Sequence, residues 1–122
     1  MIAMSVILLA EDDPLLSMLV QEILEERGYI VLSVGSADDA LSRLEHDPDI
    51  DLVVTDIDMP GRYNGFDLAA RIHDDRPAIP VIIASGKHRP TAAELHHAAF
   101  LPKPFRAEQL LAMVSAALPA TC

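Results

Sequence analysis

The segments SVILLAEDDP (residues 5–14) and DLVVTDIDMPG (residues 51–61) decide the fold of this chain. Each is a short apolar run that ends in carboxylates. A continuous apolar run of five or six residues is typical of a strand buried on both faces of a parallel sheet. An amphipathic stretch begins at Pro14 and stops at Gly28, as a helix does. The chain therefore opens as a strand followed by a helix.

The same alternation continues outward from these two segments. We expect strands at residues 5–10, 29–34, 51–55 and 79–85, and a short one near 100–101. We expect helices from Pro14, around 40–44, at 66–74 and at 106–118, with a weak one between the last two strands. Alternating strands and helices imply an α/β fold of the (βα)5 kind, with a parallel sheet covered on both faces.

The helical pattern also predicts which side chains face the core. On the first helix we expect an inner face of Leu15, Leu16, Leu19, Val20, Ile23 and Leu24. We interpret Met4, Met18 and Met113 as core filler.

Composition narrows the functional classes. The chain has 122 residues, and 51% of them are hydrophobic, which excludes a disordered tail. This length fits one domain, and we expect its core to span about residues 4–118 with no output domain. Its net charge of −10 argues against direct nucleic-acid binding and against anionic membranes. The single cysteine, Cys122, excludes an intrachain disulfide, and with no spanning segment we expect a cytoplasmic location.

Polar side chains gather where the predicted strands end. In a doubly wound sheet, functional groups collect beyond the carboxyl ends of the strands. The residues expected there are Glu11, Asp12, Asp13, Asp56, Asp58, Ser85 and Lys103. Clustered carboxylates repel one another, and a hard divalent cation such as Mg²⁺ removes the conflict. Lys103 can reach a phosphoryl oxygen, and Asp56 is a candidate nucleophile for phosphoryl transfer.

Five segments together resemble a response-regulator receiver domain over essentially the whole chain. They are ILLAEDDP (7–14), DLVVTDIDMPG (51–61), NGFDLA (64–69), PVIIASG (80–86) and FLPKPF (100–105). Any one of these segments alone is a weak indicator of the family, but all five in this order are highly specific to it. The resemblance implies a flavodoxin-like sheet, similar to the chemotaxis regulators, with strand order 2-1-3-4-5.

The resemblance also implies the phosphorylation machinery. Asp56 matches the family's phosphoacceptor, and Glu11 and Asp12 match its acidic pair, with Asp12 bound directly to Mg²⁺. Asp58 matches the position whose backbone carbonyl binds the metal. Lys103 matches the family's lysine, which precedes a cis peptide bond to a proline.

The remaining matches concern switching and phosphoryl lifetime. Ser85 and Phe100 match the switch hydroxyl and the switch aromatic. Gly86 leaves room beside the acyl phosphate. Asp58 and Lys87 match positions that tune dephosphorylation.

Three departures from the family pattern have consequences. The loop MPGRYNG (59–65) is one residue longer than usual, and the acidic pair is Glu-Asp rather than Asp-Asp. The stretch from Ser85 to Lys103 is a few residues short, so we expect a shortened or irregular fourth helix.

The leading hypothesis is a phosphorylation-controlled switch and not a turnover enzyme. A histidine kinase or a histidine phosphotransfer protein would phosphorylate Asp56, and the domain would then act on a downstream protein partner or domain as a monomer or a phosphorylation-dependent dimer. One alternative is a small phosphohydrolase using Asp56 and Asp58 as nucleophile and acid/base. Another is a receiver-like scaffold that is never phosphorylated. His73, His88, His96 and His97 are expected to be solvent-facing rather than metal ligands.

Overall fold

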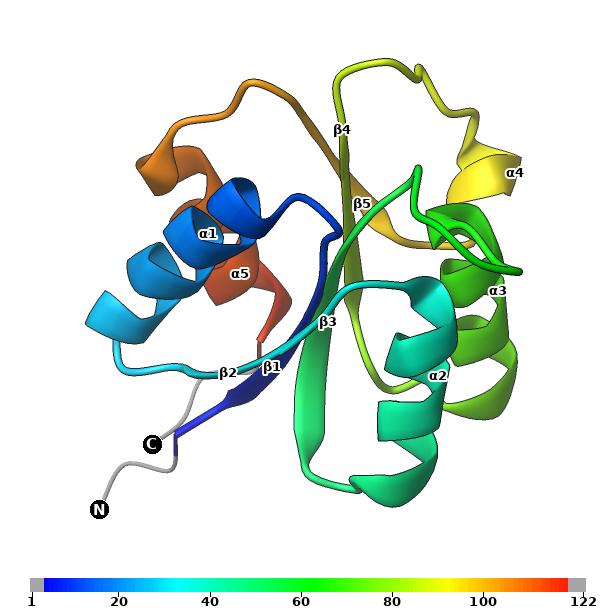
Figure 1. The fold of residues 1–122 in the computed structure, drawn as a ribbon, viewed down its shortest axis with the longest axis horizontal. Coiled ribbons are helices and arrows are strands. Elements are labelled where there is room, and N and C mark those ends of the chain that lie inside the picture. Colours follow the sequence, from blue (N-terminus) through cyan, green and yellow to red (C-terminus); the bar gives the residue numbers. More distant parts are fainter. Residues whose placement is uncertain (1–3, 119–122) are drawn as a thin grey trace.

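One parallel sheet forms the centre of the computed structural model, which describes residues 4–118 (Figure 1). Its strands are β1 (Val6–Ala10), β2 (Ile30–Val34), β3 (Ile50–Asp56), β4 (Val81–Ser85) and β5 (Ala99–Pro102). They lie in the order β2-β1-β3-β4-β5, and every neighbouring pair is parallel. The (βα)5 fold and the predicted strand order are confirmed.

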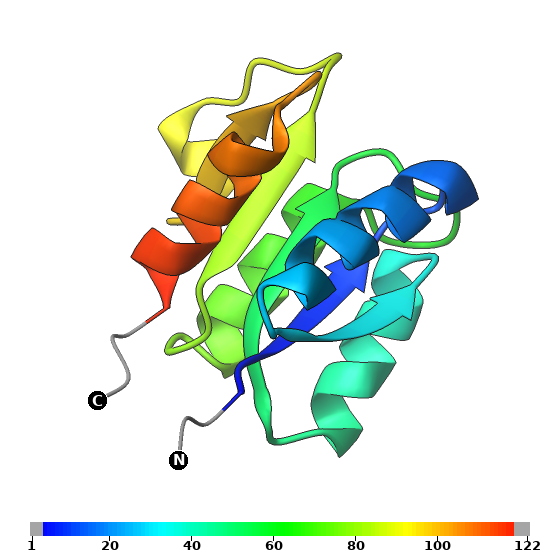
Figure 2. The same cartoon turned by 90° about the vertical axis from the view of Figure 1, so that its left-hand side faces the viewer.

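Helices cover both faces of the sheet. They are α1 (Pro14–Glu26), α2 (Ala37–His46), α3 (Gly65–Asp75), α4 (Ala92–Leu95) and α5 (Ala107–Ala117). Helices α1 and α5 pack on one face, and α2, α3 and α4 lie on the other (Figures 1 and 2). Within residues 4–118, no helix has both the length and the apolar character needed to cross a membrane.

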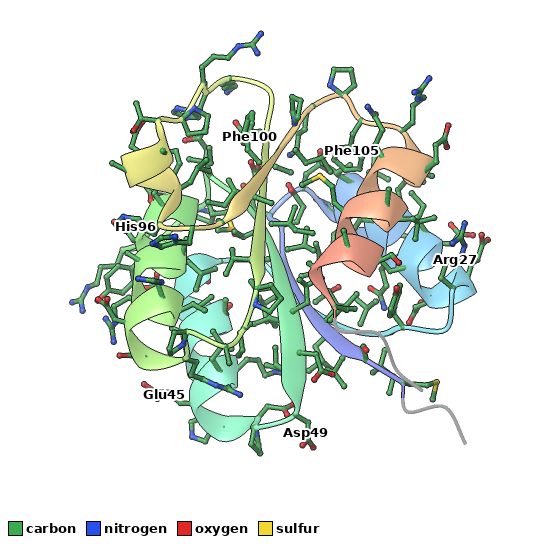
Figure 3. All side chains as sticks on the ribbon, turned by 180° about the vertical axis from the view of Figure 1, so that it is seen from behind. Arg27, Glu45, Asp49, His96, Phe100 and Phe105 are labelled. Carbon is green, nitrogen blue, oxygen red and sulfur yellow. The ribbon has the colours of Figure 1, made fainter. Side chains whose placement is uncertain are left out.

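Two-sided burial explains why the central strands are mostly apolar. In β1, Leu8 and Ala10 face the cluster under α2 and α3, whereas Ile7 and Leu9 face the cluster under α1 and α5. Successive residues of a strand point to opposite faces, so a central strand needs apolar residues at every position. Figure 3 shows side chains filling the space on both sides of the sheet.

The fourth helix is a single turn, as the short segment predicts. Helix α4 has four residues and begins with a capping box between Thr91 and Glu94. It ends where His96 and His97 adopt left-handed backbone angles, φ 48° and φ 70°. The two histidines therefore do not lie on a helix, and the ring of His97 stacks on that of His73, with 4.7 Å between centroids. All three side chains stay exposed, as predicted.

The predicted inner face of α1 is too wide. Leu15 and Leu19 are 77% and 54% exposed, and Met18, interpreted as core filler, is 67% exposed. Met4 is also exposed, whereas Met113 packs on the core as predicted. The core contacts of α1 come from one narrower stripe of Leu16, Val20, Ile23 and Leu24. A helix laid on a sheet buries one stripe only, and no element among residues 4–118 covers the first-turn side of α1.

Candidate functional site

The site lies at the carboxyl ends of four adjacent strands. Glu11 follows β1, Asp56 ends β3, Ser85 ends β4, and Lys103 follows β5. Strand β3 pairs with β1 on one side and with β4 on the other, which puts Asp56 in the middle of the group. The topology thus brings together residues that are up to 92 positions apart in the sequence.

Three carboxylates converge at this edge. Glu11, Asp12 and Asp56 each place one oxygen within 4.8 Å of the other two. Glu11 is buried, Asp56 is half-buried and Asp12 is exposed, so the cluster opens to solvent through Asp12. Hard carboxylate oxygens at this spacing are the donor set that Mg²⁺ prefers, and the residues present fit that ion.

Lys103 connects the two sides of the cluster. Its Nζ lies 3.3 Å from Glu11 Oε2 and 3.4 Å from Asp56 Oδ2. The backbone N–H of Lys103 donates to the carbonyl of Ser85 at 3.0 Å, which holds the lysine beside the end of β4. The peptide bond between Lys103 and Pro104 is cis, as the family resemblance implies. The ammonium of Lys103 therefore lies against the carboxylates of both Glu11 and Asp56.

Glu11 has an unusual electrostatic environment. Burial raises the pKa of its carboxyl group above the ordinary value of 4.5, and the nearby charge of Asp56 raises it further. Two contacts oppose this rise: the backbone N–H of Asp13 donates to Glu11 Oε1 at 3.1 Å, and Lys103 approaches Oε2. A cation bound between Glu11 and Asp56 would remove the remaining repulsion.

Asp56 is held in a defined orientation. Its Oδ1 accepts a hydrogen bond from the N–H of Ile57 at 2.7 Å, while Oδ2 faces Lys103. The hydroxyl of Thr55 donates to the Asp56 carbonyl at 2.8 Å. Both carboxylate oxygens are thus oriented before any ligand arrives.

Gly65 makes a close approach that the sequence analysis missed. A Cβ at this position would lie 2.1 Å from the Asp56 carbonyl oxygen, so only glycine fits. The Gly65 N–H donates to the carbonyl of Ile57 at 2.8 Å. The Asn64-Gly65 pair, a common turn signal, was the available clue. Helix α3 therefore begins directly against the backbone of the predicted phosphoacceptor.

Asp58 directs its side chain away from the acidic cluster. Its carboxylate oxygens lie 3.1 and 3.3 Å from His88 Nε2. His88 is partly exposed, but it is paired rather than free, which the sequence analysis did not foresee. Asp58 is not among the three converging carboxylates, and the metal contact expected from its backbone carbonyl stays a prediction.

The predicted switch residues lie on two neighbouring strands. Ser85 is 3% exposed, and its Oγ accepts a hydrogen bond from the N–H of Lys87 at 3.3 Å. Phe100 is partly buried and packs against the core under α2 and α3. A Cβ on Gly86 would lie 3.4 Å from Lys103 Cβ, so a small residue suits this position. Lys87 itself is exposed.

A family model and several known proteins match this chain. The model of the response regulator receiver domain matches residues 7–115. The DNA-binding transcriptional regulator NtrC of Bradyrhizobium sp. is 36% identical over 118 residues, covering 92% of this chain and 24% of that protein. The transcriptional regulatory protein CpxR of Escherichia coli is 34% identical over 119 residues, covering 94% of this chain and 50% of that protein.

Solved structures show the same likeness. The response regulator protein TrrA of Thermotoga maritima, in complex with Mg²⁺ and BeF, superposes with a TM-score of 0.87 at 27% identity, covering 94% of this chain and 100% of that one. A response regulator receiver domain protein of Clostridium thermocellum superposes with a TM-score of 0.86 at 28% identity, covering 93% and 94%. This chain spans about a quarter to a half of the length of the curated relatives named above.

Proposed function

The chain belongs to the response regulator receiver domain family of two-component signalling, and we propose that it accepts a phosphoryl group on Asp56 and switches conformation in response. One observation carries the assignment of the residue. The carboxylate of Asp56, at the end of β3, lies within reach of the Lys103 ammonium and converges with the carboxylates of Glu11 and Asp12. A nucleophile needs charge neutralisation and orientation for phosphoryl transfer, and these neighbours supply both.

The reaction forms an acyl phosphate. A carboxylate oxygen of Asp56 attacks phosphorus, and the bond between phosphorus and the phosphohistidine nitrogen of the donor breaks. Lys103 neutralises charge on a phosphoryl oxygen, because its ammonium already lies 3.4 Å from Asp56 Oδ2. The domain catalyses the transfer onto its own Asp56 and releases no small-molecule product in that step. We therefore propose that it acts as a switch rather than a turnover enzyme.

The acidic cluster is the proposed Mg²⁺ site. Glu11, Asp12 and Asp56 would hold the ion with their carboxylates, and Asp58 would contribute its backbone carbonyl. A bound Mg²⁺ supplies charge neutralisation for the carboxylates and the phosphoryl oxygens.

Switching would begin at Ser85. Its hydroxyl donates to a phosphoryl oxygen on Asp56, and the movement is transmitted to Phe100 on the neighbouring strand β5. The free energy that shifts the population towards the switched conformation is the difference in affinity of the two conformations for the phosphoryl group. Asp58, Gly86 and Lys87 are proposed to tune the loss of the phosphoryl group.

The exposed patch on α1, made of Leu15, Met18 and Leu19, is the proposed docking surface for the phosphodonor. The spacing puts these side chains on one helix face, and all three are more than half exposed. The patch adjoins Asp12, on the open side of the site. We expect a donor histidine to approach Asp56 from that exposed side, and its carrier would then cover this patch.

This docking proposal has its own test. Leu15→Ala and Met18→Ala should slow phosphotransfer from a histidine kinase or a histidine phosphotransfer protein, while labelling by acetyl phosphate stays unchanged. Loss of both activities together would contradict a docking role.

The downstream partner is a further proposal. Residues 1–122 form the receiver unit, and its output is a contact with another domain or protein, made as a monomer or as a phosphorylation-dependent dimer. The curated relatives include transcriptional regulators of two to four times the length. The net charge of −10 argues that this unit itself does not bind nucleic acid. A cytoplasmic location stays a prediction from the sequence.

Labelling by acetyl phosphate tests the function. With Mg²⁺, intact mass spectrometry should show one added phosphoryl group per chain, with none on Asp56→Asn. Steady release of phosphate from p-nitrophenyl phosphate would support the phosphohydrolase alternative instead. The absence of any label, together with an NMR spectrum unchanged by beryllofluoride, would support the scaffold alternative.

A further inference from the structure

A contact between Asp58 and His88 joins two loops beside the site. Asp58 belongs to the loop between β3 and α3, two residues after Asp56, and His88 belongs to the loop between β4 and α4, three residues after Ser85. Nε2 of His88 lies 3.1 Å from Asp58 Oδ2 and 3.3 Å from Oδ1. We call this contact the Asp58–His88 clasp.

A second contact fixes the imidazole of His88. Its ring meets the ring of Phe66 edge-on, with centroids 6.0 Å apart and an interplanar angle of 81°. Phe66 lies in the first turn of α3, directly after Gly65, which itself touches the Asp56 carbonyl. His88 is thus held between α3 and the Asp58 carboxylate.

The position of the clasp determines what it can block. Strands β3 and β4 are neighbours, so the loops that follow them leave the sheet side by side at its carboxyl edge. The Asp58–His88 contact bridges these two loops on the side of the sheet that carries α3 and α4. The opposite side, towards α1, is where Asp12 is exposed. The site is thus exposed at Asp12 and bridged on the other side by the exposed Asp58 and the partly exposed His88.

We propose that His88 is a positioning residue that holds the Asp58 side chain beside the site, and that the closed Asp58–His88 clasp slows the loss of the phosphoryl group. This inference rests on the proposed function. In the step concerned, a water oxygen attacks phosphorus and the bond between phosphorus and the Asp56 oxygen breaks. The products are inorganic phosphate, the free Asp56 carboxylate and a proton released to solvent. The clasp restricts the approach of that water.

The lifetime of the phosphorylated protein tests the proposal. Each protein is phosphorylated with acetyl phosphate and Mg²⁺ and freed of the donor, and intact mass spectrometry follows the loss of the phosphoryl group. His88→Ala should lose it about two- to fivefold faster than the wild type, the scale expected from breaking one exposed polar contact. His88→Lys should restore a longer lifetime, because its ammonium can pair with Asp58.

A matched control and a double variant isolate the clasp. His46→Ala removes another exposed histidine, whose Nδ1 lies 2.8 Å from the Ser42 carbonyl of its own helix, and should keep the wild-type lifetime. In an Asp58→Ala background, His88→Ala should have no further effect, since the partner is already gone. The free energy of unfolding of His88→Ala should stay within about 0.5 kcal/mol of the wild type.

The outcomes separate this inference from the proposed function. If the wild type takes up no phosphoryl group, the proposed function fails and the clasp fails with it. If the wild type is labelled but His88→Ala keeps the wild-type lifetime, only the clasp is overturned. An equal effect of His88→Ala with and without Asp58→Ala would also overturn it.

Discussion

Glu11 is a buried carboxylate whose ionised form is disfavoured by its surroundings in the site. Its side chain is 7% exposed and lies beside the like charge of Asp56, with Lys103 as the opposing cation. Burial raises the pKa of the Glu11 carboxyl group above 4.5, so the folded protein binds this proton more tightly than the unfolded chain does. The ionised form of Glu11 therefore destabilises the metal-free fold at neutral pH.

The pH dependence of stability follows from that sign. Without Mg²⁺, Glu11→Gln should unfold at higher urea concentration than the wild type at about pH 7. The wild type gains stability as the pH falls through its raised pKa, so the difference between the two proteins should shrink towards about pH 5. Urea titrations in the presence of a chelator measure both differences. A difference that stays constant or grows on acidification would contradict the raised pKa.

At the residue scale, the sequence predicts the cluster better than it predicts its surroundings. Glu11, Asp56 and Lys103 follow apolar runs directly, and parallel strands bring their carboxyl ends together whatever the loops do. The contact of Asp58 with His88 depends on the path of two irregular loops. No periodic pattern encodes such a path, which is why the sequence left His88 as a surface residue.

The start of α3 is the element most tightly coupled to the site. The helix begins at Gly65 with a capping box: Asn64 Oδ1 accepts from the N–H of Asp67, and Asp67 Oδ2 accepts from the N–H of Asn64, both at 2.9 Å. Because Gly65 lies against the Asp56 carbonyl, any side chain there must displace either the helix or the end of β3. The element and the predicted phosphoacceptor therefore share one backbone contact.

Substitution of Gly65 tests this coupling. Gly65→Ala should slow labelling by acetyl phosphate and destabilise the fold by roughly 1–3 kcal/mol, the cost of overpacking a tight contact. Gly35→Ala is the matched control, because a Cβ at Gly35 meets nothing within 4 Å. Labelling kinetics and urea unfolding of both variants give the comparison. Equal behaviour of the two alanine variants would contradict the close approach at Gly65.

Two helices show where pattern reading succeeds and fails. The single turn of α4 was predictable, because the segment between Ser85 and Lys103 has little room for a longer helix. The exposed face of α1 was not, because Leu15 and Leu19 continue the apolar pattern of the buried stripe. Exposed apolar residues look identical to core residues in a sequence, and only the packed structure separates them.

For the whole molecule, acidity and metal binding are linked to stability. The chain carries a net charge of −10, and Glu11, Asp12 and Asp56 concentrate part of it at one edge of the sheet. A cation bound only by the folded state stabilises the fold by mass action.

Magnesium should therefore raise the stability of the whole fold. At about one hundred times the dissociation constant, the expected gain in free energy of unfolding is about 2.7 kcal/mol, beyond the effect of NaCl at equal ionic strength. Asp12→Asn should lose most of this gain. Asp49→Asn should keep it, since Asp49 lies just before β3, at the end of that strand opposite to Asp56 (Figure 3). Thermal unfolding with and without Mg²⁺ measures the gain, and an equal gain from NaCl would contradict a specific site.

Identification of the phosphorylated residue tests the central claim most directly. Borohydride reduces an aspartyl phosphate to homoserine, which marks the labelled position in a peptide map. After treatment with acetyl phosphate and Mg²⁺, the wild-type protein should carry homoserine in place of Asp56 and nowhere else. Homoserine in place of Asp12 or Asp58, or a map without homoserine, would contradict the account.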